Sequence, residues 1–198
     1  MTGVQTCALP ICQRDGALAK EVIDDDVLID QNEVDVEEEC LKILALHQPV
    51  AIDLRFIVTA LKINVDLERI GDLSVNIAER SEFLARNELA PIPFDFEQMA
   101  QITQQMLRDS LDALVNMNCP LAQKVLKDDD KVDAINRQMY DQVKVAIQEH
   151  PEFIESLIHL LSVSRHLERI ADHAVNIAEE VIYMAEGRII RHKTEDYQ

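Results

Sequence analysis

Apolar residues recur at helical spacing over most of this chain. Ile57, Leu61 and Val65 follow one another at intervals of four residues, and the leucines at positions 157, 160 and 161 repeat the arrangement later in the sequence. This spacing places apolar side chains along one face of a helix, whereas a half-buried strand would alternate every second residue. The pattern therefore predicts amphipathic helices and an all-α fold.

Prolines and polar clusters indicate where these helices begin and end. Pro49 and Pro151 each stand where a helix can begin, because the first turn has no partner for the N–H that proline lacks. Pro91 and Pro93 lie in a loop over residues 87–95, and Gly187 is placed to end a helix. The pattern predicts five helices, at residues 16–46, 49–86, 96–118, 120–149 and 151–186.

The chain also repeats itself. Residues 67–79 and 167–179 are identical at ten of thirteen positions, at an offset of 100. Residues 22–30 align with residues 125–133 at an offset of 103. Such self-similarity indicates two copies of one structural unit. We therefore expect two pseudo-symmetric three-helix bundles, in which short connections make neighbouring helices antiparallel.

The first copy is expected to lack most of one helix. The helix at 96–118, shifted back by 103 positions, would have its counterpart at about positions -7 to 15. That range begins before the first residue and ends in a segment where the repeat pattern is absent. Two helices enclose an apolar seam less well than three. We therefore expect exposed apolar surface in the first half of the chain, with lower stability or a tendency to associate.

The composition agrees with a folded helical protein. Of the 198 residues, 47% are hydrophobic and only 4% aromatic, with no Trp, which is low for an all-β protein. No apolar run approaches the roughly 18 residues of a membrane-spanning helix. Acidic residues number 37 against 19 Lys and Arg, giving a net charge of -18. This charge argues against a nucleic-acid partner and favours cations or a basic protein face.

The first twelve residues require separate treatment. Residues 2–11 carry no charge and read as a translated sequencing-library adapter, so we expect residues 1–12 to be a foreign segment and the natural N-terminus to be missing. The expected domains are then the first repeat at 13–90 and the second at 91–187, with a polar tail at 188–198. Cys40 and Cys119 fall in helical patterns and are expected to be small buried hydrophobes, consistent with a reducing cytosol.

Acidic pairs at a spacing of four residues are the most informative chemical feature. This spacing places two side chains on one helix face, about 5–6 Å apart, where like charges destabilise the helix unless a cation lies between them. Carboxylates clustered without His or Cys suit hard cations such as iron, manganese, magnesium or calcium. Four such pairs occupy matching places in the two repeats, and we take them as candidate metal ligands: Asp26, Asp30, Glu68, Asp72, Asp129, Asp133, Glu168 and Asp172.

A simpler interpretation stays open at this point. Acidic pairs on helices are usually solvated, and Arg69 and Arg169 stand next to two of these pairs. Packing alone, however, gives no reason to repeat exposed Glu and Asp in both copies, so the repetition favours a ligand role. Asn76 and Asn176, one turn further along, either bond to ligand carboxylates or tie helices together.

Sequence motifs for catalysis are absent. No Glu or Asp precedes a His by three residues, which removes the Glu-x-x-His element of ferritin-like di-iron bundles. The sequence contains no glycine-rich phosphate loop and no Ser or Cys nucleophile within a known motif. We therefore expect a protein that is not an enzyme.

The chain closely resembles the PhoU family of phosphate-signalling regulators. The resemblance rests on residues 40–55, 60–63, 66–72 and 75–79 and covers about residues 17–187. It implies two three-helix bundles and multinuclear metal clusters, iron first, with manganese, magnesium or zinc as other choices. Carried over by motif, the ligands fall on the same eight carboxylates as above.

The resemblance also implies a function. A family member is expected to be a cytoplasmic, non-enzymatic homodimer that restrains phosphate uptake and holds the phosphate-starvation response off. Its expected partners are the ATPase subunit of a phosphate ABC transporter and a sensor histidine kinase at the inner face of the membrane. Two alternatives remain: a metal-dependent, carboxylate-bridged enzyme, and a helical scaffold without metal.

Overall fold

Five α-helices and one short 3-10 helix make up the part of the chain that the structure describes. The computed structural model describes residues 16–88, 94 and 96–188, so the expected foreign segment and nearly all of the polar tail lie outside the described residues. The predicted all-α class is confirmed. In chain order the elements are α3 (Gly16–His47), α4 (Ile52–Arg86), α5 (Phe96–Asn116), α6 (Cys119–Glu149), the short 3-10 helix η1 (Pro151–Phe153) and α7 (Ile154–Glu186).

The helix ends agree with the sequence prediction to within two residues except beside Pro49 and Pro151; the third helix ends at Asn116 rather than at 118, because Met117 takes a positive φ of 49°. The second helix begins at Ile52 rather than Pro49, because Gln48 and Ala51 both take positive φ angles, of 45° and 51°, that no helix accommodates. Pro151 begins a single 3-10 turn before α7. The predicted end at Gly187 is confirmed, since its φ of 69° forms a left-handed cap whose N–H bonds to Tyr183 O at 2.9 Å.

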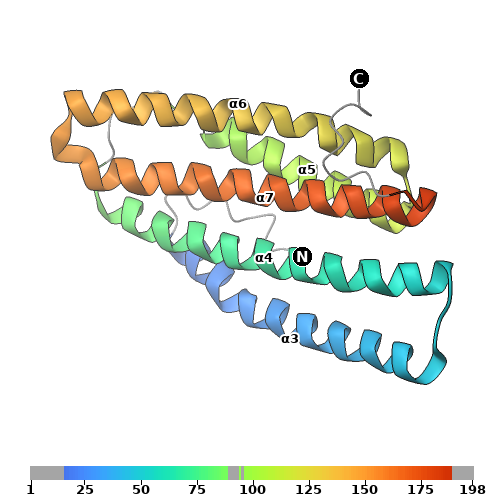
Figure 1. Ribbon diagram of the computed structural model, residues 1–198. Coiled ribbons are helices and arrows are strands. Elements are labelled where there is room, and N and C mark those ends of the chain that lie inside the picture. The colour runs from blue at the N-terminus through green and yellow to red at the C-terminus, as the bar shows by residue number, and fades with distance from the viewer. Residues whose placement is uncertain (1–15, 89–93, 95, 189–198) are drawn as a thin grey trace.

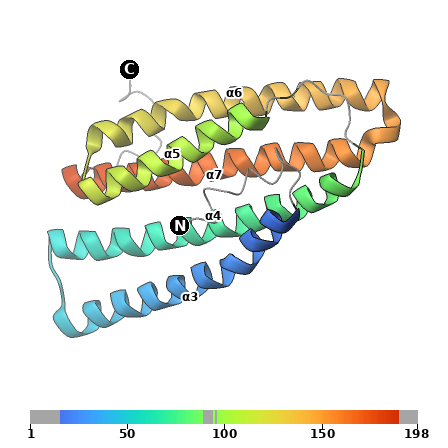
Figure 2. The same cartoon turned by 180° about the vertical axis from the view of Figure 1, so that it is seen from behind.

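Helices α5, α6 and α7 form a three-helix bundle, and each of the three packs against the other two. Figure 2 shows α5 lying along the α6–α7 pair. The centre of the bundle is apolar, and its fully buried side chains include Met99, Met106 and Val132. This arrangement is the amphipathic packing that the sequence predicted for the second repeat.

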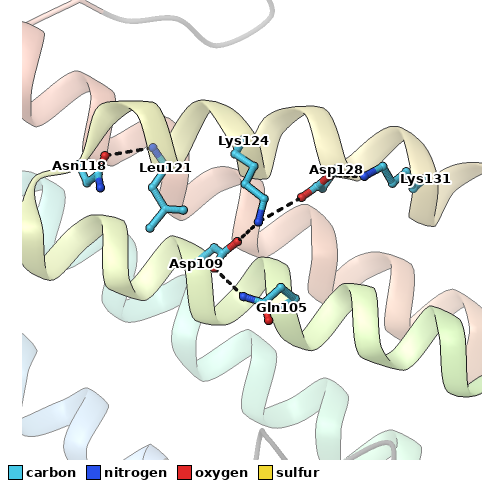
Figure 3. A network of polar contacts seen from close by, with 7 residues as sticks. All are labelled: Gln105, Asp109, Asn118, Leu121, Lys124, Asp128 and Lys131. Carbon is cyan, nitrogen blue, oxygen red and sulfur yellow. Dashed lines mark hydrogen bonds and ion pairs between the residues drawn. The ribbon is translucent and has the colours of Figure 1, made fainter.

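One end of α5 is fixed to α6 by the polar network of Figure 3. Lys124 of α6 donates to Asp109 of α5 at 2.6 Å, and this hydrogen bond raises the pKa of Lys124. Gln105 donates to the other oxygen of Asp109 at 2.7 Å. At the start of α6 the Asn118 side chain accepts from Leu121 N at 3.1 Å, which caps the helix.

Helix α4 joins the first repeat to the second by packing along α7, and the two helices lie side by side in both views (Figure 1). The two helices are antiparallel, because residues later in α4 contact residues earlier in α7. Thr59 contacts Glu180 and Asp66 contacts His173. The central motifs of the two repeats therefore run in opposite directions through the middle of the molecule.

Helix α3 packs chiefly against α4 and leaves apolar surface exposed. Its buried contact with α4 is a small cluster of Ala19, Val22 and Ala78. Val36 is 41% exposed, whereas Met139 at the equivalent place in α6 is fully buried. A mainly apolar cavity of about 320 Å³ is also present, and residues of α3, α4 and α5 line it. The expected exposure of apolar surface in the first half of the chain is confirmed.

Among the described residues, no helix combines the length and the apolar character needed to cross a bilayer. Cys40 is buried and Cys119 half-buried, and burial is the main cause that raises the pKa of both thiols. Both are free cysteines, which agrees with their expected place as small apolar side chains.

Candidate metal centres

The eight predicted carboxylates lie on two helix pairs. Asp26 and Asp30 of α3 face α4, which carries Glu68 and Asp72, and the pairs interact electrostatically across the helix contact. We call these four residues the first cluster. The second cluster combines the carboxylates of α6 and α7 in the same way: Asp129, Asp133, Glu168 and Asp172.

In the first cluster the charges are brought together at a close approach of α3 to α4. A Cβ atom added to Gly71 would lie 2.8 Å from Asp26 Oδ1, so glycine leaves the space that this carboxylate uses. Burial, followed by repulsion from Asp30, Asp72 and Glu68, raises the pKa of Asp26. Mutual repulsion of this kind shows that the carboxylates share one small region.

Arg69 lies beside the first cluster. Its Nε is 3.4 Å from Glu68 Oε2, and its Nη1 is 3.4 Å from Asp72 Oδ2. The pKa of Glu68 is nevertheless raised, since burial and the charge of Asp72 outweigh the arginine. The simpler interpretation, in which an arginine holds the acidic pair, therefore describes part of the first cluster.

The second cluster concentrates negative charge more strongly. Burial and the charges of Asp172 and Asp133, with smaller contributions from Asp130 and Glu168, raise the pKa of Asp129 to about 6. The pKa values of Glu168 and Asp172 are also raised, chiefly by burial and then by neighbouring carboxylates. Three carboxylates of this cluster, Asp129, Glu168 and Asp172, thus hold their protons more tightly than usual, and a cation placed among them would stabilise their charged forms.

The two clusters differ in how arginine neutralises them. Arg137 contacts Asp133, with Nη1 3.3 Å from Oδ2. Arg169 stands at the repeat position of Arg69, but within the part of the chain that the structure describes it forms no ion pair with Glu168 or Asp172. Among the described residues, no guanidinium therefore bridges the two carboxylates that α7 contributes, although the charge of Arg169 opposes the rise in the pKa of both Glu168 and Asp172.

The donor set fits a hard cation. Each cluster offers carboxylate oxygens from two facing helices, and such oxygens are the ligands of iron, manganese, magnesium and calcium. Over residues 16–88, 94 and 96–188, no three His, Cys, Asp or Glu side chains are already grouped closely enough to hold a metal ion. The residues thus provide carboxylate oxygens on facing helices.

Sequence reasoning missed the contact of Asp66 with His173 between the repeats, whereas the alternative that Asn176 ties helices together is confirmed. Asp66 Oδ1 lies 2.8 Å from His173 Nδ1 and accepts from Asn176 Nδ2 at 3.1 Å, so Asn176 ties α7 to α4. Asn76 instead donates to the backbone of its own helix, at Asp72 O. The sequence did carry one signal for a contact here: the two repeats differ at this position, with Asp at 66 and His at 166.

A second missed contact lies nearer the end of α7. Glu180 is only 2% exposed, and Lys62 Nζ lies 3.0 Å from its Oε1. Thr59 Oγ1 donates to Oε2 of the same carboxylate at 3.4 Å. The repeat places Arg80 where the second copy has Glu180, so this ion pair exists at one end of the α4–α7 contact and not at the other.

Comparisons with known proteins identify the family. The PhoU domain profile matches residues 11–81 and 96–181. A phosphate-specific transport system accessory protein PhoU homolog of Aquifex aeolicus is 43% identical over 176 residues, which are 89% of this chain and 80% of that protein. The homolog of Caulobacter vibrioides is 35% identical over 185 residues, covering 93% and 80%.

Solved structures agree. The crystal structure of PhoU from Pseudomonas aeruginosa superposes with a TM-score of 0.92 at 34% identity, covering 94% of this chain and 90% of that one. The phosphate transport system regulatory protein PhoU from Streptococcus pneumoniae gives 0.82 at 29% identity, covering 95% and 88%. These relatives are named as accessory and regulatory proteins rather than as enzymes. The resemblance predicted from the sequence is confirmed, and the chain belongs to the PhoU family.

Proposed function

We propose that this protein is a metal-binding, non-enzymatic regulator of phosphate uptake and of the phosphate-starvation response. Two facing carboxylate sets, one in each repeat, are the observation that carries the metal-binding part. The printed names of the relatives, which are accessory and regulatory proteins of phosphate transport, support the regulatory part.

The two carboxylate sets would hold multinuclear metal clusters, with iron first and manganese, magnesium or zinc as other choices. The ligands are Asp26, Asp30, Glu68 and Asp72 in the first repeat, and Asp129, Asp133, Glu168 and Asp172 in the second. A bound cation supplies positive charge to a surface that is otherwise strongly acidic. This chain's own residues position the oxygens on rigid, packed helices, and the raised pKa values of Asp26 and Asp129 indicate charges that lack compensation.

The regulatory part of the proposal names the partners. The protein would act in the cytoplasm as a negative regulator and adaptor, peripheral to the membrane and dimeric. It would contact the ATPase subunit of a phosphate ABC transporter and a sensor histidine kinase. The repeats would share one three-helix design, since α3 and α4 correspond to α6 and α7 in sequence.

A metal count tests the site. The chain is purified without chelator, loaded with iron(II) or manganese(II) and analysed by elemental analysis, beside Glu168→Gln/Asp172→Asn. We expect this variant to lose about half of the bound metal. The control is Asp35→Asn/Glu39→Gln, an exposed acidic pair with the same spacing on α3. An unchanged count in the first variant, or an equal loss in the control, would remove the second cluster from the proposal.

A cellular assay tests the regulation. The chain and the same two variants are expressed in a bacterium that lacks its own PhoU, with a reporter of the starvation response. We expect the wild type and the control to repress the reporter when phosphate is plentiful, and the site variant to repress less. Full repression by a metal-free variant would separate regulation from the metal.

A further inference from the structure

A groove lined by arginines lies on α6 and α7, next to the second cluster. It has a volume of about 840 Å³ and is open to solvent. Its lining includes Arg137 of α6 and Arg165 and Arg169 of α7. Hydrogen-bond donors also come from Asn136, Tyr140 and Ser162. The whole sequence has only 19 Lys and Arg against 37 Asp and Glu, so three arginines in one groove are an unusual gathering of guanidinium groups in this chain.

Two of these guanidinium groups are available to a ligand. Arg165 and Arg169 are exposed, and in the region that the structure describes neither forms an ion pair with a carboxylate, although the charges of both oppose the rise in the pKa of Glu168. They are four residues apart on α7, which places them on the same helix face. Arg137 faces them from α6 and is 70% exposed, with Asp133 as its ion-pair partner.

The first repeat does not carry this feature. The positions that correspond to Arg137 and Arg165 are Val34 and Val65, and the position of Tyr140 is Glu37. Helices α3 and α4 pack together in the same way as α6 and α7 without these arginines. Packing of the repeat therefore does not require these arginines.

Carboxylates lie in the same groove. Asp141, Glu168 and Asp172 contribute to its lining, so their charges offset those of the three arginines. A fully deprotonated anion would be repelled by these oxygens. An anion that keeps a proton can instead donate an O–H to a carboxylate while its other oxygens accept from guanidinium groups.

We propose that this groove binds inorganic phosphate. Phosphate carries at least one proton near neutral pH, and its remaining oxygens match the planar fork of arginine. Sulfate has the same shape but no proton to donate, so the mixed lining favours phosphate over sulfate. The proposed site shares Glu168 and Asp172 with the second cluster, so it belongs to the metal-free form of the protein. It goes beyond the proposed regulatory function, because it places a direct phosphate site in the second repeat.

Equilibrium dialysis of the full chain with radiolabelled phosphate, at pH 7 and with a chelator present, tests this site. We expect saturable binding of one phosphate per chain, with sulfate competing at least about tenfold less well. Arg165→Gln/Arg169→Gln should weaken phosphate binding by about tenfold or more, since each lost charged hydrogen bond has that order of effect. Arg165→Lys/Arg169→Lys should bind phosphate with an affinity between those of the wild type and the glutamine variant, because lysine keeps the charge and loses the planar fork of the guanidinium.

The control is Arg86→Gln/Arg108→Gln, which removes the same charge outside the groove. We expect less than a twofold change in its affinity, and unchanged helicity by circular dichroism in all variants. Absence of saturable binding to the wild type, or equal losses in the groove variant and the control, would overturn the proposal. So would sulfate binding as tightly as phosphate. The chelator keeps this outcome independent of the metal count described above.

Discussion

The Asp66 carboxylate of α4 and the His173 imidazole of α7 are 2.8 Å apart, and their contact joins the two repeats. Their side chains are 13% and 17% exposed, so the pair is largely shielded from water. Asn176 donates to the same oxygen of Asp66. One carboxylate thus serves two donors from the opposite helix.

Asp66→Ala should therefore destabilise the protein. The change leaves His173 and Asn176 without their shared acceptor, and an unsatisfied buried donor costs about 1–3 kcal/mol. Urea unfolding followed by circular dichroism measures the change in the free energy of unfolding. The control is Glu79→Ala on the exposed face of α4, which we expect to alter that free energy by less than about 1 kcal/mol. An equal change in the free energy of unfolding for Asp66→Ala and Glu79→Ala would show that the contact between the repeats adds no stability.

Lys62→Ala should destabilise the other end of the α4–α7 contact. The Glu180 side chain is only 3% exposed, and removing its cationic partner leaves a charge in a poorly solvated place. Breaking a buried pair costs about 3–5 kcal/mol, and because Lys62 itself is 42% exposed we expect about 2–3 kcal/mol. Thermal melts compare it with Lys131→Ala, whose partner Asp128 lies nearer the surface, at 17% exposure. A smaller loss for Lys62→Ala than for the control would contradict this ranking.

Helix α3 should open more readily than α6. The two helices have nearly equal lengths, of 32 and 31 residues, and corresponding places in the repeat. Helix α6 is covered by both α5 and α7, whereas α3 packs chiefly against α4 and adjoins an apolar cavity. Amide hydrogen exchange followed by mass spectrometry should show α3 peptides exchanging at least about tenfold faster. Similar protection of both helices would indicate that α3 is covered in solution, for example by association of chains.

Asp129 should make the metal-free protein more stable in mild acid. The folded-state pKa is raised to about 6 from an ordinary value of 3.8, so the folded chain binds a proton that the unfolded chain does not between about pH 6 and pH 4. Stability from this group increases as the pH falls through that window and is lost as the pH rises. Asp129→Asn should remove about 1–3 kcal/mol of this pH dependence, measured by urea unfolding with a chelator present. With a divalent cation in excess the trend should reverse, because protons and the cation compete for the same oxygens.

His166 should make the protein less stable as the pH falls, which is the opposite of the effect of Asp129 over a similar pH range. Burial, then the charges of Arg80, Arg169 and Arg165, lower its pKa to about 4, and neither ring nitrogen has a hydrogen-bond partner within the described part of the chain. The unfolded chain therefore binds this proton from about pH 6.5 downward, and stability falls until about pH 4. His166→Leu should reduce this acid-side loss and leave stability at pH 7 equal or higher, as melting curves at both values can show. A variant with the same acid sensitivity as the wild type would exclude this histidine as its source.

Local sequence signals predicted much of the fold. The repeat at residues 67–79 and 167–179, with the four-residue spacing of Glu168 and Asp172, indicated which helices pair and which faces carry acid. These features depend on helical periodicity within one repeat. The start of α4 was predicted three residues early, because the positive φ of Ala51 has no signal in the sequence. The Asp66–His173 contact was also missed, since spacing within a repeat does not tell which surfaces of two repeats meet.

Because Arg69 contacts two carboxylates of the first cluster, the two clusters differ before any cation binds. An ion that approaches Glu68 and Asp72 must first displace a guanidinium group that already contacts both, whereas in the described part of the second cluster the arginine contact, from Arg137, is to Asp133 and not to Glu168 or Asp172. If cations bind as proposed, the second repeat would fill at a lower free concentration and the first only at a higher one. The molecule would then respond to rising cation supply in two successive steps, with a half-loaded form between them.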